Sequence, residues 1–194
     1  MGLAAMLAVA GIGFLAYPWV SDVYTKEVVQ RRLRTEFSTP EAKVRYERRE
    51  VPEGDGLTRI VIPKLGVDTI VVEGTSPAAL KAGAGHYPES PLPGEAGNMA
   101  IAGHRTTYGK PFADIDTLAE GDEIHLETPV GFYVYRVASK PFIIEPTDRS
   151  VLESTELATL TLTTCHPRRS AAQRLIVQAV LDPTARVAPA QGSR

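Results

Sequence analysis

The sequence predicts an all-β domain, a closed barrel or sandwich of eight strands, preceded by an apolar helix. The first observation behind this prediction is a series of eight short runs of β-branched and aromatic residues, separated by Gly, Pro and Asp. The second is that the helical segments among them, at 77–82 and 112–118, are short, which disfavours a doubly wound sheet. The third is an uncharged run at residues 3–20.

The expected strands all fall between residues 57 and 182, so we assign one domain to that range. Residues 21–36 read as an exposed amphipathic helix or stalk, 37–56 as a linker without periodicity, and 183–194 as a disordered tail. The strands are expected at 58–62, 67–73, 97–103, 122–127, 131–138, 141–145, 158–164 and 174–181.

The N-terminal run of eighteen uncharged residues at 3–20 predicts a transmembrane anchor over residues 1–20. Tyr17 and Trp19 suit a membrane interface. A cleaved signal peptide would need a basic start and a small-residue cleavage site, which this run lacks, and a buried core helix is the other alternative. The positive-inside rule alone places the domain in the cytoplasm, because basic residues follow the run, at Lys26, Arg31, Arg32 and Arg34.

Composition excludes several classes of function. The formal net charge of −2 gives no basic field for nucleic acid. A single cysteine allows neither an internal disulfide nor a metal site made of cysteines alone. Cys165 is therefore either a buried small hydrophobic residue or a working thiol.

The position of this cysteine favours a working thiol. Along 158–164 the sequence alternates, so that Leu160 and Leu162 face the core, while Thr161, Thr163 and Cys165 share the other face. The strand ends there, which holds a side chain rigidly at the edge of the fold.

Two further residues complete a pattern typical of acyl transfer. A hairpin brings Arg174 close to Cys165, and His104 ends another expected strand. A thiolate nucleophile, an imidazolium that protonates the leaving amine, and a guanidinium that stabilises an oxyanion together suit this chemistry. Structural alternatives exist for each: a packed cysteine, a histidine satisfied in a turn, and a solvated arginine.

The remaining histidines are weaker candidates. His125 lies within an alternating strand and reads as structural. His166 could compete with His104 as the base, but neighbouring residues on a strand point to opposite faces, so we favour His104. A zinc site made from His86, His104, His166 and Cys165 has no supporting ligand spacing.

The motif TLTTC at 161–165, with Arg174 nine residues on and GH at 103–104, resembles the sortase transpeptidases of Gram-positive bacteria. HYPESPLPGEAGNMAIAGHRTTYG and TLTTCHPRRSAAQR look most like the class E sortases of actinobacteria. Class C pilin sortases are the next neighbour, but their Asp-Pro-aromatic lid motif is absent from 37–56. The resemblance covers residues 57–182 and implies the eight-stranded sortase barrel.

The resemblance also implies roles for individual residues. Cys165 is the expected nucleophile, His104 the acid and base, and Arg174 the stabiliser of the transition state. Thr164 matches a position that helps to hold the oxyanion, and we assign Thr163 to the same substrate-binding region.

The expected function is that of a single-pass membrane sortase with an extracellular catalytic domain. It would cut a Leu-Ala-x-Thr-Gly or Leu-Pro-x-Thr-Gly (LAXTG or LPXTG) sorting signal of a secreted protein between Thr and Gly. An amine of a peptidoglycan precursor, lipid II, would then resolve the thioacyl enzyme. This chemistry needs no metal and no organic cofactor. The alternatives are a pilin-polymerising class C enzyme, and a membrane-anchored β-barrel binding module without catalysis.

Tyr87 is our candidate for reading the second residue of the signal. Proline has no backbone N–H, whereas alanine has one that needs an acceptor, and a phenol can supply it. The structural alternative is that Tyr87 packs a loop against Pro88.

Overall fold

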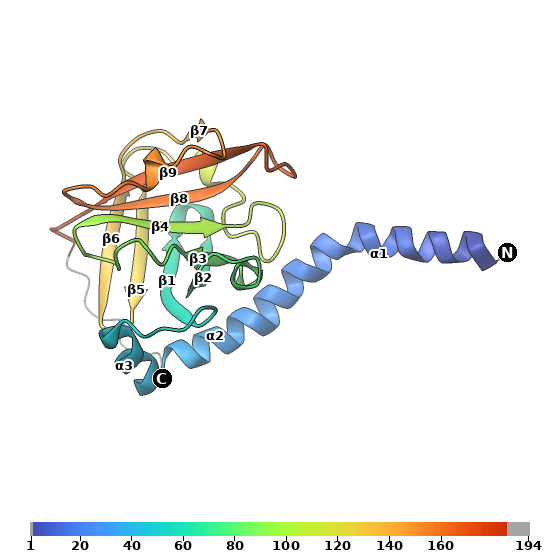
Figure 1. Cartoon of the computed structure of the whole chain (residues 1–194), viewed down its shortest axis with the longest axis horizontal. Helices are drawn as coiled ribbons and strands as arrows, with labels where there is room; N and C mark the ends of the chain where they lie inside the picture. Colours follow the sequence, from blue (N-terminus) through green and yellow to red (C-terminus); the bar gives the residue numbers. More distant parts are fainter. Residues whose placement is uncertain (1, 186–194) are drawn as a thin grey trace.

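The structure is a computed structural model that describes residues 2–185. Its strands form one sheet in the order β6-β5-β1-β2-β3-β4-β8-β9, and a further pairing of β6 with β9 closes these eight strands into a barrel (Figure 1). A ninth strand, β7, pairs with β9 outside this ring. The bounds are β1 (Gly56–Ile62), β2 (Val67–Glu73), β3 (Ala84–His86), β4 (Gly97–Gly103), β5 (Glu123–Thr128), β6 (Gly131–Val137), β7 (Phe142–Ile144), β8 (Ala158–His166) and β9 (Gln173–Leu181).

All eight predicted strands are present, and the barrel has eight strands as expected, but its membership differs by one. The ring includes β3, which sequence analysis missed, and excludes β7, which it had counted. The Ala-Gly-His sequence of β3 has little strand propensity. Its place depends on Gly85, where a Cβ would lie 2.1 Å from the carbonyl oxygen of Gly74. Only glycine allows the two backbones to approach so closely.

Short one-turn helices fill the connections where helical segments were expected. Of these, η3 (Ala79–Ala82) and η4 (Ile115–Thr117) fall within the two predicted ranges. Two more are η2 (Pro63–Leu65) and η5 (Ser150–Leu152).

The barrel interior is the hydrophobic core, and Leu160 and Leu162 of β8 are fully buried in it, as predicted. The threonine face of β8 is covered as well. Thr161 donates to the side-chain oxygen of Asn98 at 2.8 Å, and Asn98 in turn donates to the carbonyl of Val151 at 2.7 Å. These hydrogen bonds satisfy the buried polar groups on that face.

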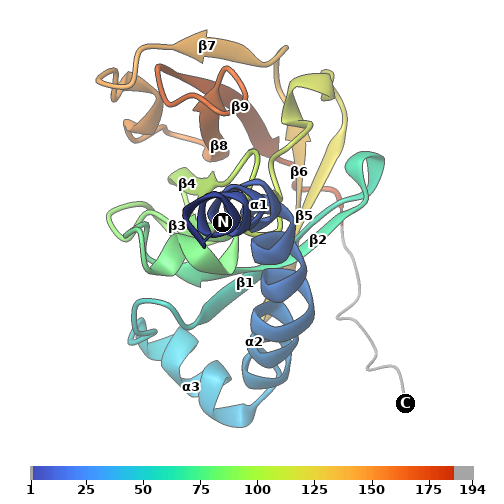
Figure 2. The same ribbon diagram turned by 90° about the vertical axis from the view of Figure 1, so that its right-hand side faces the viewer.

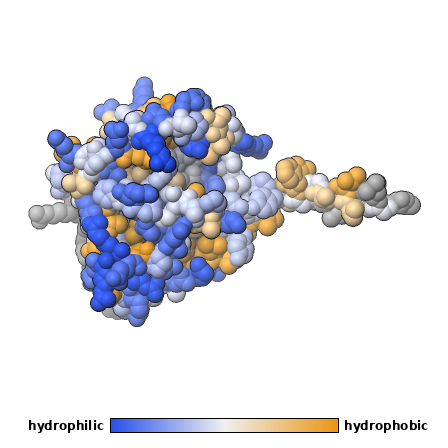
Figure 3. Space-filling view, viewed as in Figure 1, coloured by the Kyte–Doolittle hydropathy of each residue, from blue (hydrophilic) through white to orange (hydrophobic). Residues whose placement is uncertain are grey.

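The chain begins with α1 (Gly2–Tyr24), followed by a π-helical turn, η1 (Thr25–Val29), and α2 (Gln30–Phe37). The first part of α1 extends away from the barrel and carries exposed hydrophobic residues (Figures 1 and 3). From Tyr17 onward it contacts the domain through polar groups. A transmembrane anchor was predicted at 1–20, and within residues 2–185 we find no helix with the length and apolar character that crossing a membrane requires.

Residues 21–36 are helical and α2 is amphipathic, as expected, but the segment is docked on the barrel and is not an exposed stalk. Gln30, Leu33 and Phe37 lie on one face of α2 and are buried. Leu33 and Phe37 join a second hydrophobic cluster with Ile70 and Val72 of β2. Figures 1 and 2 place α2 and α3 at the side of the barrel away from β7 and β9.

The expected linker at 37–56 contains a helix, α3 (Pro40–Arg48). Thr39 caps its start by accepting from the backbone N–H of Ala42, and Pro40 occupies the first turn, where proline is tolerated. The Thr-Pro-Glu start signal was therefore present in the sequence. Of the predicted tail, residues 183–185 form a turn region and 186–194 lie outside the described residues.

Candidate active site

Cys165 and Arg174 are direct partners across the β8–β9 hairpin. Directly opposite residues of an antiparallel pair share one face, with their Cβ atoms about 4.5–5.5 Å apart. Cys165 is partly exposed and carries a free thiol. The hairpin therefore places the thiol and the guanidinium side chain on the same face, as sequence analysis expected.

His104 reaches the same edge of the sheet from β4. Strands β4 and β8 run parallel, with Ala102 paired to Thr163. One step further, the Thr164 hydroxyl donates to the carbonyl of Gly103 at 2.7 Å. The next residues along the two chains are His104, directly after the end of β4, and Cys165, near the end of β8, so both lie at the shared carboxyl edge of these strands.

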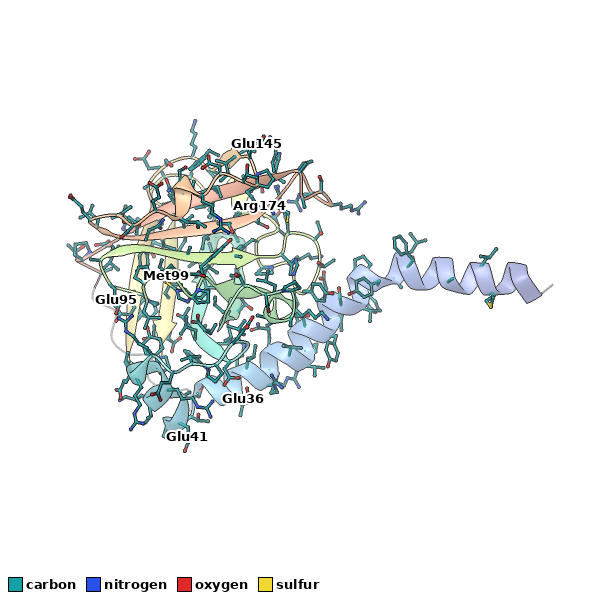
Figure 4. All side chains as sticks on the ribbon, in the orientation of Figure 1. Glu36, Glu41, Glu95, Met99, Glu145 and Arg174 are labelled. Atoms are coloured by element: carbon teal, nitrogen blue, oxygen red, sulfur yellow. The ribbon has the colours of Figure 1, made fainter. Side chains whose placement is uncertain are left out.

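The Arg174 side chain lies beside β8 and β9 (Figure 4). Its Nη1 donates to the carbonyls of Ala171 and Gln173, both at 3.0 Å. Within the described residues Nε and Nη2 have no protein partner, which leaves N–H groups to bind a substrate oxygen.

His104 is partly buried against a neighbouring ring. Its imidazole centroid lies 4.9 Å from that of Tyr108. Burial lowers the pKa of His104 below its ordinary value, because desolvation disfavours the imidazolium. The backbone is fixed on both sides, since His104 N–H donates to Gly83 and the His104 carbonyl accepts from Phe112, each at 3.1 Å.

Sequence analysis missed Arg105, which is almost fully buried beside the site. It forms an ion pair with Asp116 at 2.8 Å and donates to His166 Nδ1 at 2.9 Å. Its Nη1 also lies 3.5 Å from the Cys165 carbonyl oxygen. A charged residue directly after a buried strand and a histidine was the available signal.

This contact also separates the two histidines that compete for the role of base. Arginine has only donors, so Nδ1 of His166 must accept and carries no proton. This contact occupies one of the two ring nitrogens of His166, whereas no hydrogen bond within the described residues occupies the imidazole of His104, which lies against Tyr108. The arrangement favours His104 as the acid and base.

Of the three predicted substrate-binding residues, Tyr87 and Thr163 are in direct contact. The Tyr87 hydroxyl is 3.4 Å from the Thr163 hydroxyl. The Thr164 hydroxyl proton is used by Gly103, so this side chain braces β4 against β8. Their contact with substrate remains a prediction.

The other two histidines have structural partners. His86 is buried and bonded to Glu73 at 3.0 Å and to Ser90 at 2.9 Å. His125 pairs with Glu123 at 2.9 Å. Among the described residues no group of three or more His, Cys, Asp or Glu side chains is arranged to hold a metal ion.

A comparison with known protein families identifies the class of protein to which this fold and site belong. The family described as Sortase domain matches residues 60–182. The chain therefore belongs to the sortase family, whose members are cysteine transpeptidases.

Class E sortases are among its relatives, which confirms the resemblance seen in the sequence. Sortase SrtE1 of Streptomyces coelicolor is 37% identical over 139 residues, covering 64% of this chain and 40% of that protein. Sortase D of Bacillus subtilis is 33% identical over 135 residues, covering 69% and 65%. The chain thus matches less than two thirds of the length of either curated relative.

Solved structures show the same fold. The Sortase D5 transpeptidase of Clostridium perfringens superposes with a TM-score of 0.69 at 32% identity, covering 84% of this chain and 99% of that one. Sortase E1 of Streptomyces coelicolor, solved with a tripeptide in its active site, gives 0.63 at 33% identity, covering 68% and 91%.

Proposed function

We propose that this chain cuts a sorting signal of the LAXTG or LPXTG type between Thr and Gly and joins the new carboxyl end to an amine of a peptidoglycan precursor. The observation that supports this most is the convergence of Cys165, Arg174 and His104 at one edge of the sheet. The tripeptide in the active site of Sortase E1 indicates that such a site accepts a peptide.

In the first half of the reaction the Cys165 thiolate attacks the threonine carbonyl carbon. A C–S bond forms and the carbonyl electrons move onto oxygen. When this tetrahedral species collapses, the Thr–Gly C–N bond breaks and the His104 imidazolium gives its proton to the leaving amine. The product is a thioacyl enzyme and a neutral imidazole.

In the second half an acceptor amine attacks the thioacyl carbon. His104, now neutral, takes the proton from the incoming nitrogen, and the C–S bond breaks as the new amide forms. The thiolate and imidazolium are regenerated, so the cycle consumes no cofactor.

Arg174 has the geometry to stabilise the oxyanion in both halves. It stands opposite Cys165, and its free N–H groups can form parallel hydrogen bonds to one developing negative charge. The same groups can also hold a substrate carbonyl in the ground state, and the two roles differ in their kinetic effect.

We place the catalytic domain on the outer face of the cell. Proteins that carry sorting signals are secreted, and lipid II presents its amine there. Both proposed substrates are thus available only on that side.

The deciding experiment incubates the full chain with matched LAXTG and LPXTG peptides and weighs the intact protein by mass spectrometry. We expect an adduct on Cys165 equal in mass to the acyl fragment, which disappears when an amine acceptor is added. Cys165→Ala should form no adduct and no product, with an unchanged circular dichroism spectrum.

The outcomes separate the alternatives. Cleavage by the Cys165→Ala variant would overturn the assignment. Binding of peptides without any adduct would favour a non-catalytic binding module, and transfer only to a pilin lysine would favour a class C-like polymerase.

A further inference from the structure

The loop that carries His104 away from β4, residues 104–114, is held by the N-terminal helix. Asp22 near the end of α1 is buried and accepts from the backbone N–H of Gly109 at 3.1 Å. Its other carboxylate oxygen pairs with Lys110 at 3.1 Å. One helix residue therefore fixes both the backbone and a side chain of this loop.

A second contact leads from the helix to the histidine itself. Tyr17 of α1 is hydrogen-bonded to Tyr108 through their hydroxyl groups at 2.5 Å, and the two rings meet edge to face. The ring of Tyr108 in turn lies against His104, with centroids 4.9 Å apart. Two rings thus connect the helix to the imidazole.

The loop needs such support because its backbone is strained. Tyr108, Gly109 and Lys110 have consecutive φ values of 51°, 77° and 40°. Positive φ is unfavourable for residues other than glycine and persists only where surrounding contacts impose it. The contacts that surround these three residues include Tyr17 and Asp22 of the helix.

The segments that directly follow α1, namely η1 and α2, are firmly attached to the barrel. The Gln30 amide bonds to both the N–H and the carbonyl of Ile70, and also to the carbonyl of Ala82. Thr25 in the π-helical turn donates to the carbonyl of Lys81 at 3.2 Å. Beside the helix lie two cavities of about 470 and 690 Å³, both lined by Tyr108. The helix therefore holds residues 108–110 through the discrete contacts of Tyr17 and Asp22, while Phe112 of the same loop is buried in the barrel core.

We propose that the N-terminal helix is a positioning element for His104, acting through Asp22 on Gly109 and Lys110 and through Tyr17 on Tyr108. This inference rests on the proposed function, because it concerns how the acid and base of that reaction is held. Asp22 and Tyr17 touch neither substrate nor thiol in this scheme, so they are positioning residues.

The test compares Asp22→Ala with Arg34→Ala in the full chain. Arg34 of α2 joins the same continuous helical segment to the barrel, through an ion pair with Asp68 at 2.9 Å, and forms no hydrogen bond or ion pair with the described residues of the loop. We expect Asp22→Ala to lower kcat roughly fivefold with KM unchanged, the effect of losing a hydrogen bond of typical net strength. Arg34→Ala should leave kcat unchanged.

Conservative variants sharpen the result. Asp22→Asn keeps an oxygen for the Gly109 N–H and should recover most of the lost kcat. Tyr17→Phe keeps the ring but loses the hydroxyl, and should lower kcat roughly twofold to threefold, a small share of one hydrogen bond. Thermal unfolding of each variant shows whether a change in kcat merely follows a change in stability.

Three results would overturn the inference: equal kcat in Asp22→Ala and Arg34→Ala, a loss confined to KM, or no recovery in Asp22→Asn. These results are distinct from failure of the proposed function, which would appear as the absence of a Cys165 adduct in the unmodified protein.

Discussion

Two loops leave the barrel beside Cys165, and they are held very differently. The loop after β4, at 104–114, contains the buried Arg105 and Phe112 and is bonded to the N-terminal helix. The loop after β8, at 167–172, exposes Arg168 and its neighbours to solvent. The comparison teaches that His104, the proposed acid and base, lies on a loop held by buried contacts, while the loop on the hairpin side of Cys165 is open to solvent.

Replacing the two histidines in turn tests this comparison most strongly. We expect His104→Ala to lower kcat/KM by roughly 10²- to 10⁴-fold, the usual contribution of a general acid and base. His166→Ala should change it little, because His166 contacts Arg105 and carries no proton on the bonded nitrogen. The reverse pattern would show that the wrong loop had been assigned.

The dependence of kcat/KM on pH is a second test of which of the two histidines is the acid and base. The protein should show a bell-shaped dependence of kcat/KM on pH, with one limb set by His104. The active pair needs an ionised thiol and a protonated His104, so when the thiol has the higher pKa of the two, the acidic limb follows the pKa of His104. Since burial lowers that pKa, the acidic limb should lie below the ordinary imidazole value of about 6.5. The His104→Ala variant should lose this limb, and His166→Ala should keep it.

Arg174 lies on the β8–β9 hairpin, and its substitution tests what this hairpin contributes to the reaction. Arg174→Lys keeps the charge but loses the planar pair of donors. If it stabilises an oxyanion, kcat should fall roughly 10²- to 10³-fold with KM nearly constant. A rise in KM alone would make Arg174 a residue that positions substrate.

The stability of the two loops can be compared with one arginine from each. Arg105→Met leaves the His166 and Cys165 acceptors near it without a donor and should lower the free energy of unfolding by about 1–3 kcal/mol. Arg168→Met removes an exposed ion pair with Asp114 and should cost about 0–1 kcal/mol. Chemical denaturation of both variants measures the difference, and equal values would contradict it.

The last comparison concerns substrate selection. The preference is the kcat/KM for an LAXTG peptide divided by that for a matched LPXTG peptide. Tyr87→Phe should lower this ratio roughly fivefold, the value of one hydrogen bond. Tyr24→Phe, an exposed tyrosine of α1, is the matched control. An equal fall for both peptides would make Tyr87 part of the scaffold.

The parts of the fold that sequence analysis predicted are those set by local patterns. Alternation in β8 and the short hairpin to β9 were enough to place Cys165 near Arg174. The parts that the sequence did not predict depend on distant contacts. Strand β3 requires the close backbone approach of Gly85 to Gly74, and α2 is held on the barrel by the hydrogen bond from the Gln30 side chain to Ile70. No local pattern contains either partner.

The site divides in the same way. His104 was selected because it ends an expected strand and because alternation along the strand disfavoured His166, and the family resemblance then matched it; nothing local connects it to Cys165. Arg105 was missed because its partners Asp116 and His166 lie on different segments of the chain. Its burial follows from how these segments assemble and could not be deduced from its position in the sequence.

The parallel pairing of β4 with β8 has a consequence for the order of events during folding. Their pairing joins residues about sixty positions apart, with Ala102 opposite Thr163, and β5 to β7 are formed in between. Contacts of such long sequence separation form late and slowly in folding. A nascent chain therefore carries its single thiol without the histidine beside it, so we expect catalytic competence to emerge only when the barrel closes.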